Sequence, residues 1–323
     1  MPKAIRFYAP GGPEVLRLED VAIGDPGPGE CRVRHTAIGV NFVDTYHRSG
    51  LYPLPLPSGL GVEGAGVVEA VGAGVGHLAP GDRVVYTGPI GSYSEVRLAP
   101  AERLVRLPAG VDPREAAAAF TKGLTVWAFV TRAHPVHAGE TVLVQAAAGG
   151  VGLLMVQWLK AIGANVIGTA GSDEKAARAR QAGCDHVIVY TRDDFARRVR
   201  ELTNGAGVPV VYDSVGKATF EGSLDCLAPR GLMVSFGNAS GVVPPFDLME
   251  LARRGSLFLT RPSVFHYIAR REELEEGAAA LFAMMGSGKL KVEISRSWPL
   301  AQAAEAHRAL QARATTGSVL LEP

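Results

Sequence analysis

The pattern of hydrophobic and polar positions changes twice along the chain. In residues 1 to about 120, short β-type runs such as 31–38, 66–71 and 83–86 are separated by Gly/Pro turns. Regularly spaced turns of this kind favour a barrel-like antiparallel β unit. Between about 120 and 262, strand-like and helix-like stretches alternate, and this pattern predicts a doubly wound α/β sheet.

The central segment contains six candidate strands. Most are rich in Val, Ile and Leu without alternation, as expected for parallel strands that are buried on both faces. The candidate strands span residues 141–146, 165–170, 186–190, 210–214, 232–236 and 257–260. Helical stretches between the first five include 151–162, 174–182 and 195–203.

The segment after Pro262 has a third pattern. It predicts a helix over about 271–285, a strand over 290–294, a helix over 301–312 and a final strand over 318–321. At roughly 60 residues this tail is marginal as a domain of its own. We therefore predict that residues 1–120 plus 263–323 form one discontinuous domain, into which an α/β domain of residues 121–262 is inserted.

Composition places the 323-residue chain among globular proteins, because 47% of its residues are hydrophobic and only 20% are charged. The formal net charge of +1 gives no field that would draw the chain to nucleic acid or anionic lipid. Cys31, Cys184 and Cys226 lie too far apart in sequence for a disulfide framework or a cysteine-built zinc site. No apolar run reaches the length of a membrane span, and the first residues lack the apolar region of a signal peptide. We expect a cytoplasmic location.

The segment 142–152 carries the most specific local signal. Its end reads Ala147-x-Gly149-Gly150-Val151-Gly152, a form of the dinucleotide fingerprint with Ala in place of the first Gly. The middle glycine lets the backbone approach a pyrophosphate, and the last lets helix and strand pack closely, while the helix start supplies free N–H groups. Because the turn follows a buried strand and opens a helix, it predicts nucleotide binding rather than a plain tight turn.

The end of the second central strand indicates NADPH rather than NADH. An NAD site usually places a carboxylate there, whereas this chain has Gly171 and Ser172, with Lys175 close behind. Small residues, hydroxyl donors and a positive charge suit a 2′-phosphate. The two acids directly after Ser172 are interpreted as first-turn helix residues that interact with the helix dipole. Tyr190, at the end of the third strand, either covers the adenosine side or packs on the sheet.

Eight ordered motifs carry a resemblance to a known family. They are Gly11-Gly12-Pro13-Glu14-Val15-Leu16, Gly39-Val40-Asn41-Phe42-Val43-Asp44-Thr45-Tyr46, Arg48-Ser49-Gly50-Leu51-Tyr52-Pro53, Gly59-Leu60-Gly61-Val62-Glu63-Gly64-Ala65-Gly66, Lys122-Gly123-Leu124-Thr125, Ala146-Ala147-Ala148-Gly149-Gly150-Val151-Gly152, Tyr212-Asp213-Ser214-Val215-Gly216 and Arg313-Ala314-Thr315-Thr316-Gly317-Ser318. On these motifs the chain resembles the medium-chain dehydrogenase/reductase superfamily over essentially its whole length. Within that superfamily it is most similar to the zinc-free, zeta-crystallin-like NADPH:quinone oxidoreductases.

The resemblance implies a GroES-like β domain built from both ends of the chain, a central Rossmann domain, a cofactor cleft between them and a homodimer. We place the dimer contact at the last strand of the central sheet, 256–260. Zinc-dependent relatives have a histidine ligand where this chain has Val62 and a cysteine ligand where it has Val40. Valine cannot bind zinc. His134 and His137 show a metal-like spacing, but they flank Pro135 in a loop and are interpreted as surface residues, so we predict no metal.

The resemblance also assigns site residues. To the nicotinamide side it assigns Asn41, Asp44, Tyr46 and Thr125. To the other cofactor contacts it assigns Ser214, Phe236, Gly237, Asn238, Pro262, Ser263, Val264 and Arg313.

Three residues are the candidates for catalysis: Asn41, Tyr46 and Tyr52. Asn41 offers a donor and an acceptor to the carboxamide or to an acceptor oxygen, or is a turn residue. The two tyrosines suit stacking on a flat ring or hydrogen bonding, although Tyr52 alternatively caps the barrel.

These assignments favour metal-independent hydride transfer from NADPH to a quinone, because a quinone delocalises the incoming charge without a Lewis acid. An NADPH-dependent alkenal or enone C=C reductase needs the same pocket and stays an alternative. A low-turnover cofactor-sensing or nucleic-acid-binding protein is the rival of another class. Its only support would be the clusters Arg197-Arg198-x-Arg200 and Arg270-Arg271, which sit beside acids and are interpreted as solvated helix faces.

Overall fold

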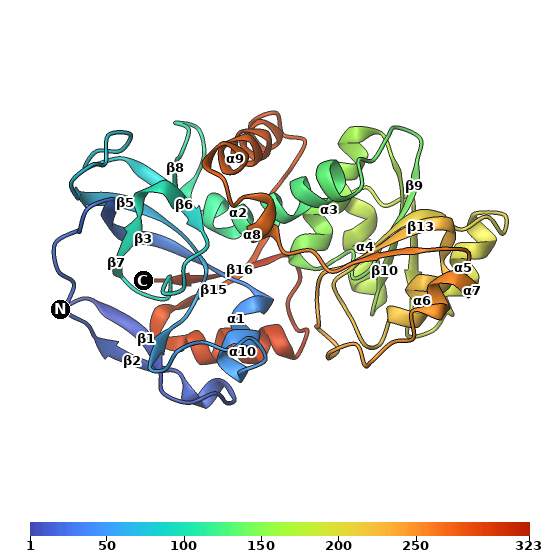
Figure 1. Ribbon diagram of the computed structural model, residues 1–323, viewed down its shortest axis with the longest axis horizontal. Coiled ribbons are helices and arrows are strands. Elements are labelled where there is room, and N and C mark those ends of the chain that lie inside the picture. Colours follow the sequence, from blue (N-terminus) through green and yellow to red (C-terminus); the bar gives the residue numbers. More distant parts are fainter. The chain divides into compact units, whose positions relative to one another are not determined.

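A computed structural model describes all 323 residues, and residue contacts divide the chain into two compact units (Figure 1). The β-rich unit consists of Met1–Lys122, Ile268–Gly286 and Val292–Pro323. The α/β unit consists of Gly123–Tyr267 and Ser287–Lys291. The prediction placed the domain boundaries at 120 and 262 and assigned all of 263–323 to the β-rich domain, whereas Ser287–Lys291 groups with the α/β unit. The catalytic and cofactor-binding roles of the two units stay predictions.

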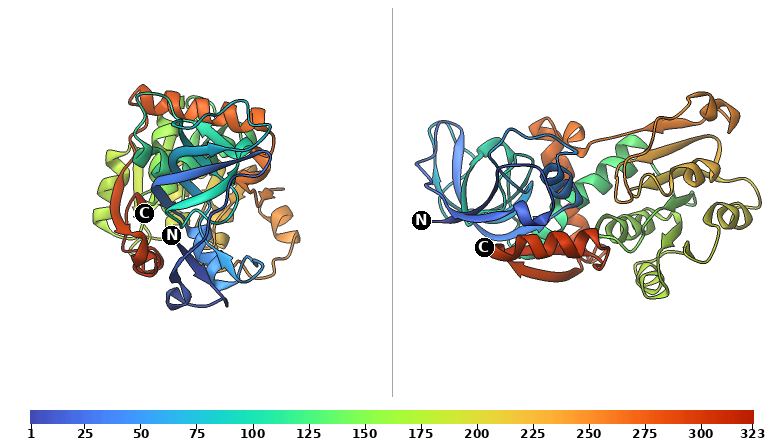
Figure 2. Two further views of the ribbon diagram at one scale, coloured as in Figure 1. Left: turned by 90° about the vertical axis from the view of Figure 1, so that its left-hand side faces the viewer. Right: turned by 90° about the horizontal axis from the view of Figure 1, so that it is seen from below.

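The α/β unit is built on a six-stranded parallel sheet with the order β11-β10-β9-β12-β13-β14. Its strands are β9 (Thr141–Val144), β10 (Asn165–Ala170), β11 (His186–Val189), β12 (Val208–Asp213), β13 (Leu227–Ser235) and β14 (Phe258–Thr260). Helices pack against these strands (Figure 2), namely α3 (Gly150–Ile162), α4 (Asp173–Gln181), α5 (Phe195–Leu202) and α6 (Phe220–Asp225). The prediction of a doubly wound parallel sheet is therefore confirmed.

The chain has five further helices between Pro113 and Gln311. They are α2 (Pro113–Ala128), α7 (Met249–Arg253), α8 (Val264–Tyr267), α9 (Arg271–Gly286) and α10 (Ala303–Gln311). None of the helices combines the length and the apolar character needed to cross a bilayer.

The predicted strand over 290–294 is wrong. The strand in this part of the chain is β15 (Ile294–Pro299), which begins where the prediction ended. Upstream of it, the backbone of Lys291 bonds to a side chain instead of a neighbouring strand: its N–H donates to Gln157 Oε1 at 2.8 Å, and its carbonyl accepts from Gln157 Nε2 at 3.1 Å. A side-chain amide on α3 thus takes the place of a β ladder.

The β-rich unit contains a three-stranded and a seven-stranded sheet. Its strands are β1 (Lys3–Phe7), β2 (Arg17–Asp20), β3 (Glu30–Val40), β4 (Ser58–Gly59), β5 (Glu63–Val71), β6 (Arg83–Thr87), β7 (Val96–Pro100), β8 (Leu104–Arg106), β15 and β16 (Ser318–Glu322). The C-terminal strand β16 pairs antiparallel with β3, with Val319 opposite Val40 (Figure 1). The end of the chain therefore completes the sheet that its beginning starts.

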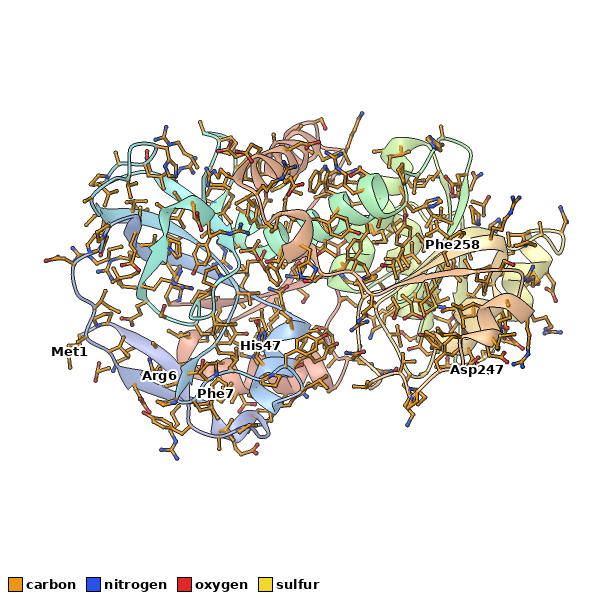
Figure 3. The ribbon with its side chains drawn as sticks, viewed as in Figure 1. Met1, Arg6, Phe7, His47, Asp247 and Phe258 are labelled. Atoms are coloured by element: carbon orange, nitrogen blue, oxygen red, sulfur yellow. The ribbon has the colours of Figure 1, made fainter.

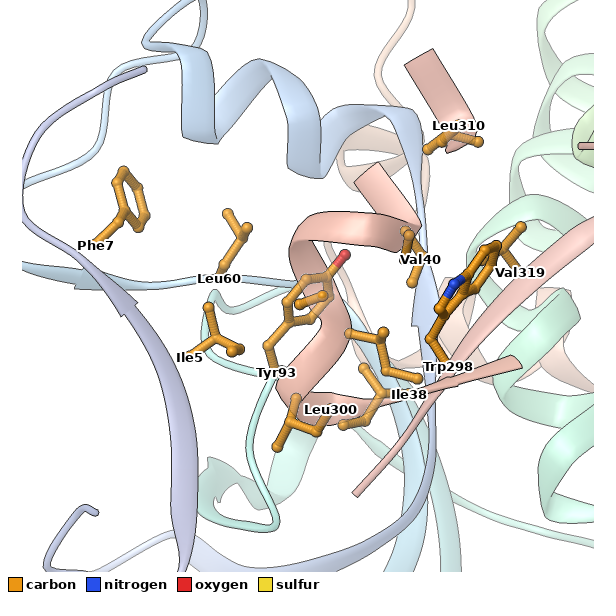
Figure 4. Packing of buried hydrophobic residues seen from close by; sticks show 13 residues of the cluster. Ile5, Phe7, Ile38, Val40, Leu60, Tyr93, Trp298, Leu300, Leu310 and Val319 are labelled. Atoms are coloured by element: carbon orange, nitrogen blue, oxygen red, sulfur yellow. The ribbon is translucent and has the colours of Figure 1, made fainter. Parts of the chain in front are cut away.

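A hydrophobic cluster holds these two ends of the chain together (Figure 4). It joins Ile5 and Phe7 of β1 with Ile38 of β3, Trp298 of β15 and Leu310 of α10. Each is less than 10% exposed, so that side chains from residues 5 to 310 share one core.

Helix α1 (Phe42–Ser49) follows β3 directly and carries His47 (Figure 3), and its first residue, Phe42, packs against this core. Asn41 occupies the N-cap position, and its backbone N–H donates to Asp44 Oδ2 at 2.8 Å. Gly50 ends the helix at φ 80°, a left-handed conformation that suits glycine.

A buried chain of hydrogen bonds runs from α1 to α10 within the same core. Arg48 Nη1 contacts His307 Nδ1 at 3.1 Å, His307 Nε2 contacts the Tyr93 hydroxyl at 3.0 Å, and that hydroxyl donates to Asp44 Oδ2 at 3.0 Å. Arginine has no acceptor, so His307 Nδ1 must accept and Nε2 must carry the proton. The chain therefore runs in one direction and ends at the carboxylate of Asp44.

Burial controls the ionisation of two members of this chain, His307 and Asp44. Desolvation, followed by the charge of Arg48, lowers the pKa of His307 to about 3 and keeps the ring neutral. Desolvation raises the pKa of Asp44 to about 7, against the hydrogen bonds from the Asn41 backbone and Tyr93 that favour the carboxylate.

We predict that Asp44 makes stability fall as the pH rises. The folded pKa near 7 lies above the ordinary value of 3.8, so the contribution is complete below about pH 4 and is lost by about pH 7. Between pH 5 and 8 the free energy of unfolding of the wild type should fall by about 2 to 3 kcal/mol relative to Asp44→Asn. Urea denaturation at both pH values measures this difference. Asp25→Asn, at a side chain that is 96% exposed, is the control; equal pH dependence in wild type and Asp44→Asn would contradict the assignment.

Candidate functional site

Apart from Thr125, the predicted cofactor residues of the α/β unit follow the carboxyl ends of its parallel strands. The strand order reverses between β9 and β12, which is the switch point where such sheets bind ligands. Ala147 and Gly149 to Gly152 follow β9, Gly171, Ser172 and Lys175 follow β10, Tyr190 follows β11, Ser214 follows β12, Phe236, Gly237 and Asn238 follow β13, and Pro262, Ser263 and Val264 follow β14. The fold therefore brings these residues to one edge of the sheet.

The glycine turn leaves the start of α3 open. Gly149 is the N-cap residue, and no side chain of the protein caps the helix there. A Cβ on Gly152 would lie 2.3 Å from the carbonyl oxygen of Ala146, so only glycine allows this close approach. The first N–H groups of an uncapped helix are a natural phosphate site, and the residues present therefore fit a dinucleotide.

Buried polar side chains form a hydrogen-bond network that fixes the glycine turn at Ala146. Thr169 Oγ1 accepts from the N–H of Ala146 at 3.1 Å and donates to Gln145 Oε1 at 2.6 Å. Gln145 Nε2 donates to Ser223 Oγ at 3.0 Å, and that hydroxyl donates to Asp213 Oδ2 at 2.8 Å. The network crosses from β10 through the end of β9 to α6 and β12. The sequence analysis assigned none of these four positioning residues to the site. Gln145, Thr169 and Asp213 are polar side chains at the ends of apolar strands, whereas Ser223 lies on α6 and gives no such signal.

The loop after β12 is fixed by the same carboxylate. Asp213 Oδ1 accepts from the N–H groups of Val215 and Gly216 at 2.7 and 3.0 Å. A Cβ on Gly237 would lie 2.0 Å from the carbonyl oxygen of Ser214, so the loops after β12 and β13 touch. Arg261 Nη1 donates to the Gly237 carbonyl at 3.0 Å and ties the end of β14 to them.

The end of β10 has the features expected of a 2′-phosphate site. A Cβ on Gly171 would lie 2.6 Å from the Tyr190 hydroxyl, so these two predicted cofactor residues are neighbours. Ser172 caps α4 by accepting from the N–H of Lys175 at 3.3 Å. Asp173 lies in the first turn of α4, as interpreted from the sequence, and Arg192 contacts it at 3.2 Å. Arg192, exposed beside this loop, is a further basic residue that the sequence analysis missed.

In the β-rich unit the three candidate catalytic residues lie on or beside α1: Asn41 is its N-cap, Tyr46 lies within it and Tyr52 follows it. Asn41 is 8% exposed, and its Nδ2 donates to Glu63 Oε2 at 2.7 Å. The rings of Tyr46 and Tyr52 meet edge to face with centroids 5.3 Å apart, and the Tyr52 N–H donates to the Tyr46 carbonyl. The two remaining predicted residues lie elsewhere: Thr125 is buried on α2 in the α/β unit, and Arg313 is exposed directly after α10.

Glu63 and Lys122 form a buried ion pair that the sequence analysis did not single out. Glu63 Oε1 accepts from the N–H of Thr121 at 2.5 Å, and Lys122 Nζ lies 3.6 Å from Glu63 Oε2. The side chains are 0% and 7% exposed. The only sequence signal for this pair is that Glu63 and Lys122 are each a single charged residue in an otherwise apolar, Gly/Ala-rich stretch.

The positions that bind zinc in the related dehydrogenases do not fit a metal ion. Val40 and Val62 are each 1% exposed and have no ligand atom. The neighbouring Glu63 carboxylate is engaged by Asn41 and Thr121. No group of three or more His, Cys, Asp or Glu side chains is arranged to hold a metal, and His134 instead contacts Glu140 at 2.5 Å.

Comparison with known proteins places this arrangement in a family. The alcohol dehydrogenase GroES-like domain model matches residues 27–109, and the zinc-binding dehydrogenase model matches residues 150–283. The chain is 54% identical to the quinone oxidoreductase of Pseudomonas aeruginosa, covering 100% of both chains. It is 46% identical to the 2-haloacrylate reductase of a Burkholderia species, covering 100% of this chain and 99% of that protein.

A solved structure matches equally well. The crystal structure of Escherichia coli quinone oxidoreductase complexed with NADPH superposes with a TM-score of 0.98 at 50% identity, covering 99% of this chain and 100% of that one. The predicted fold class, a Rossmann sheet inserted into a GroES-like domain, is confirmed. The chain belongs to the quinone oxidoreductase, zeta-crystallin-like branch of the medium-chain dehydrogenase/reductase superfamily.

Proposed function

We propose that the protein is an NADPH-dependent quinone reductase that transfers hydride without a metal ion. The observation that carries the proposal is the combination of an uncapped, glycine-rich helix start with two buried valines, Val40 and Val62, at the positions of metal ligands. The first binds a dinucleotide, and the second removes the Lewis acid that an unactivated alcohol or ketone needs. Full-length identity of 50–54% to curated quinone oxidoreductases supports the same activity.

Each part of the chain has a role in this reaction. NADPH, when bound, supplies the hydride. The N–H groups at the start of α3 hold its pyrophosphate, while Ser172 and Lys175 bind the 2′-phosphate. Asn41, fixed by Glu63, orients the carboxamide or the acceptor oxygen, and the Tyr46–Tyr52 pair offers an aromatic surface to a flat acceptor. The protein acts mainly by orienting the acceptor relative to the nicotinamide ring of NADPH.

Reduction of a conjugated C=C bond is the second candidate function. The identity of 46% to a 2-haloacrylate reductase favours it, because that name describes an activated alkene as the acceptor. A nucleic-acid-binding role lacks such support. Arg198 contacts Glu201, Arg270 contacts Glu273 and Arg271 contacts Glu275, so these arginines are paired with acids.

We also propose a homodimer built through β14. This strand ends the six-stranded sheet, and its outer edge has no partner strand within the chain. Phe258 on β14 is 61% exposed (Figure 3), and Leu248 and Met249 nearby in sequence are 74% and 57% exposed. A second copy that pairs along this edge would cover both the unpaired backbone groups and the apolar side chains. A cytoplasmic location accords with three cysteines that are all buried and unpaired.

Quinone turnover is the direct test of the function. We expect the wild type to oxidise NADPH faster with 1,4-benzoquinone and 1,2-naphthoquinone than with 2-alkenals, with no loss of rate in a chelator, as followed by absorbance. Asn41→Ala and Tyr46→Ala should each lower kcat by roughly tenfold or more, because orientation of the acceptor is lost. Faster turnover of 2-alkenals would favour the C=C reductase. NADPH binding without any oxidation would favour the cofactor-sensing role, and intact turnover in both variants would remove the proposed site.

Cofactor choice tests the end of β10. Lys175→Ala should weaken NADPH binding by roughly tenfold and leave NADH binding unchanged, because only NADPH carries the 2′-phosphate. Titration calorimetry measures both affinities, and Lys289→Ala, at an exposed lysine, is the matched control. Wild-type protein that binds NADH as tightly as NADPH, or a Lys175→Ala variant with undiminished NADPH affinity, would refute the assignment.

Oligomeric state tests the role of β14. The wild type should have twice the chain mass of 34.0 kDa in sedimentation equilibrium, whereas Phe258→Glu should sediment as a single chain. The new carboxylate would be buried unpaired at the contact, which is unfavourable. Leu18→Glu, at an exposed position on β2 in the β-rich unit, should leave the dimer intact. A monomeric wild type, or a dimeric Phe258→Glu variant, would exclude this contact.

A further inference from the structure

The ammonium of Lys122 is buried and makes no hydrogen bond. The residue is 6% exposed, and its Nζ atom has no hydrogen-bond partner within the protein. Glu63 Oε2 lies 3.6 Å away, close enough to balance the charge but too far for a hydrogen bond. An ammonium group has three N–H donors, and leaving them unsatisfied in the interior is unfavourable. The atom therefore has the donor capacity to bind another group.

Glu63 holds the lysine in place without using its donors. Its carboxylate accepts from the N–H of Thr121 at 2.5 Å and from Asn41 Nδ2 at 2.7 Å. Glycine at position 39 leaves room for this carboxylate, because a Cβ there would lie 2.3 Å from Oε2. The pair is neutral as a whole, so the site holds a positively charged donor without a net buried charge.

Lys122 lies near Asn41, the residue that we propose orients the acceptor. Asn41 Nδ2 and Lys122 Nζ are both within 4 Å of the same oxygen, Glu63 Oε2. The structure has two further buried side-chain atoms without a hydrogen-bond partner, Asp44 Oδ1 and His47 Nδ1, and both belong to α1, which begins after Asn41. Asp44 also accepts from the backbone N–H of Asn41, so unused hydrogen-bonding capacity lies next to Asn41.

We propose that Lys122 forms a subsite for the acceptor oxygen that becomes negatively charged during reduction. The inference rests on the proposed function and specifies its substrate class: quinones, and conjugated carbonyl compounds or carboxylates, in which an oxygen gains or carries negative charge. Hydride adds to the acceptor and NADPH becomes NADP⁺, while the displaced π-electron pair moves onto the acceptor oxygen. The Lys122 ammonium donates a hydrogen bond to that oxygen, and a proton from water then completes the product. A positively charged donor at the developing oxyanion lowers the barrier.

A coloured anion tests the subsite without turnover. 4-Nitrophenol absorbs differently in its neutral and ionised forms, so absorbance across a pH series reports which form binds to the NADP⁺-saturated protein. We expect the wild type to bind the phenolate at least roughly tenfold more tightly than the phenol. The double variant Glu63→Gln/Lys122→Met removes both charges together and avoids an unpaired buried carboxylate; its preference should fall below about twofold. Lys122→Arg should keep the preference, and Lys289→Met is the control at an exposed lysine.

Turnover and binding together separate the possible outcomes. The double variant should lose roughly 100-fold in kcat with quinones relative to Glu63→Gln alone, which changes the partner of Asn41 in the same way, while its circular dichroism stays that of the wild type. A double variant that keeps both kcat and the phenolate preference would show that Lys122 only balances Glu63, and would overturn the subsite. A wild type that does not bind the phenolate would overturn it as well. A wild type that binds phenolate but oxidises NADPH with no quinone would instead refute the proposed function.

Discussion

The burial of one carboxylate determines how the β-rich unit is put together. Glu63 is 0% exposed, and a charge in that position is stable only when surrounding groups compensate it. The amide of Asn41, the backbone N–H of Thr121 and the ammonium of Lys122 do so. Because these groups come from the start of α1 and from α2, the carboxylate fixes both helices relative to β5. Gly39 belongs to the same constraint, since any side chain there would collide with the carboxylate.

In the α/β unit, the sheet and a network of hydrogen bonds fix the positions of the loops. The sheet sets the positions of the loops, because parallel strands end at a common edge. A chain of side-chain hydrogen bonds from Asp213 to Thr169 then holds the N–H of Ala146, which has a φ of 53°. A non-glycine residue in that conformation is unfavourable unless its surroundings stabilise it. These hydrogen bonds hold the turn proposed to bind phosphate in a fixed conformation, which would reduce the entropy lost on binding.

Local sequence patterns predicted most of the fold, because the signals for it are local. The buried strand β10 spans Asn165–Ala170, as predicted, and the glycine turn has its predicted place between β9 and α3. The strand over 290–294 was wrong because Gln157, more than 130 positions away, binds that backbone. Glu63 and Lys122 were missed for a related reason: a charged residue in an apolar stretch has no meaning until its partner, 59 positions away, is known. Pairs that form only in the folded chain leave no periodic trace in sequence.

The type of acceptor follows from the strength of the charge that the site can provide. A metal ion at the positions of Val40 and Val62 would stabilise a localised alkoxide, but valine excludes it. A single ammonium, already partly balanced by Glu63, provides a weaker field. That field is sufficient only for an oxyanion whose charge spreads over a conjugated π-system. A stronger, unbalanced charge would be costly to bury in the absence of substrate. In the proposed subsite the neutral Lys122–Glu63 pair would meet two requirements: it is stable without substrate, and it favours acceptors that delocalise the electrons they receive.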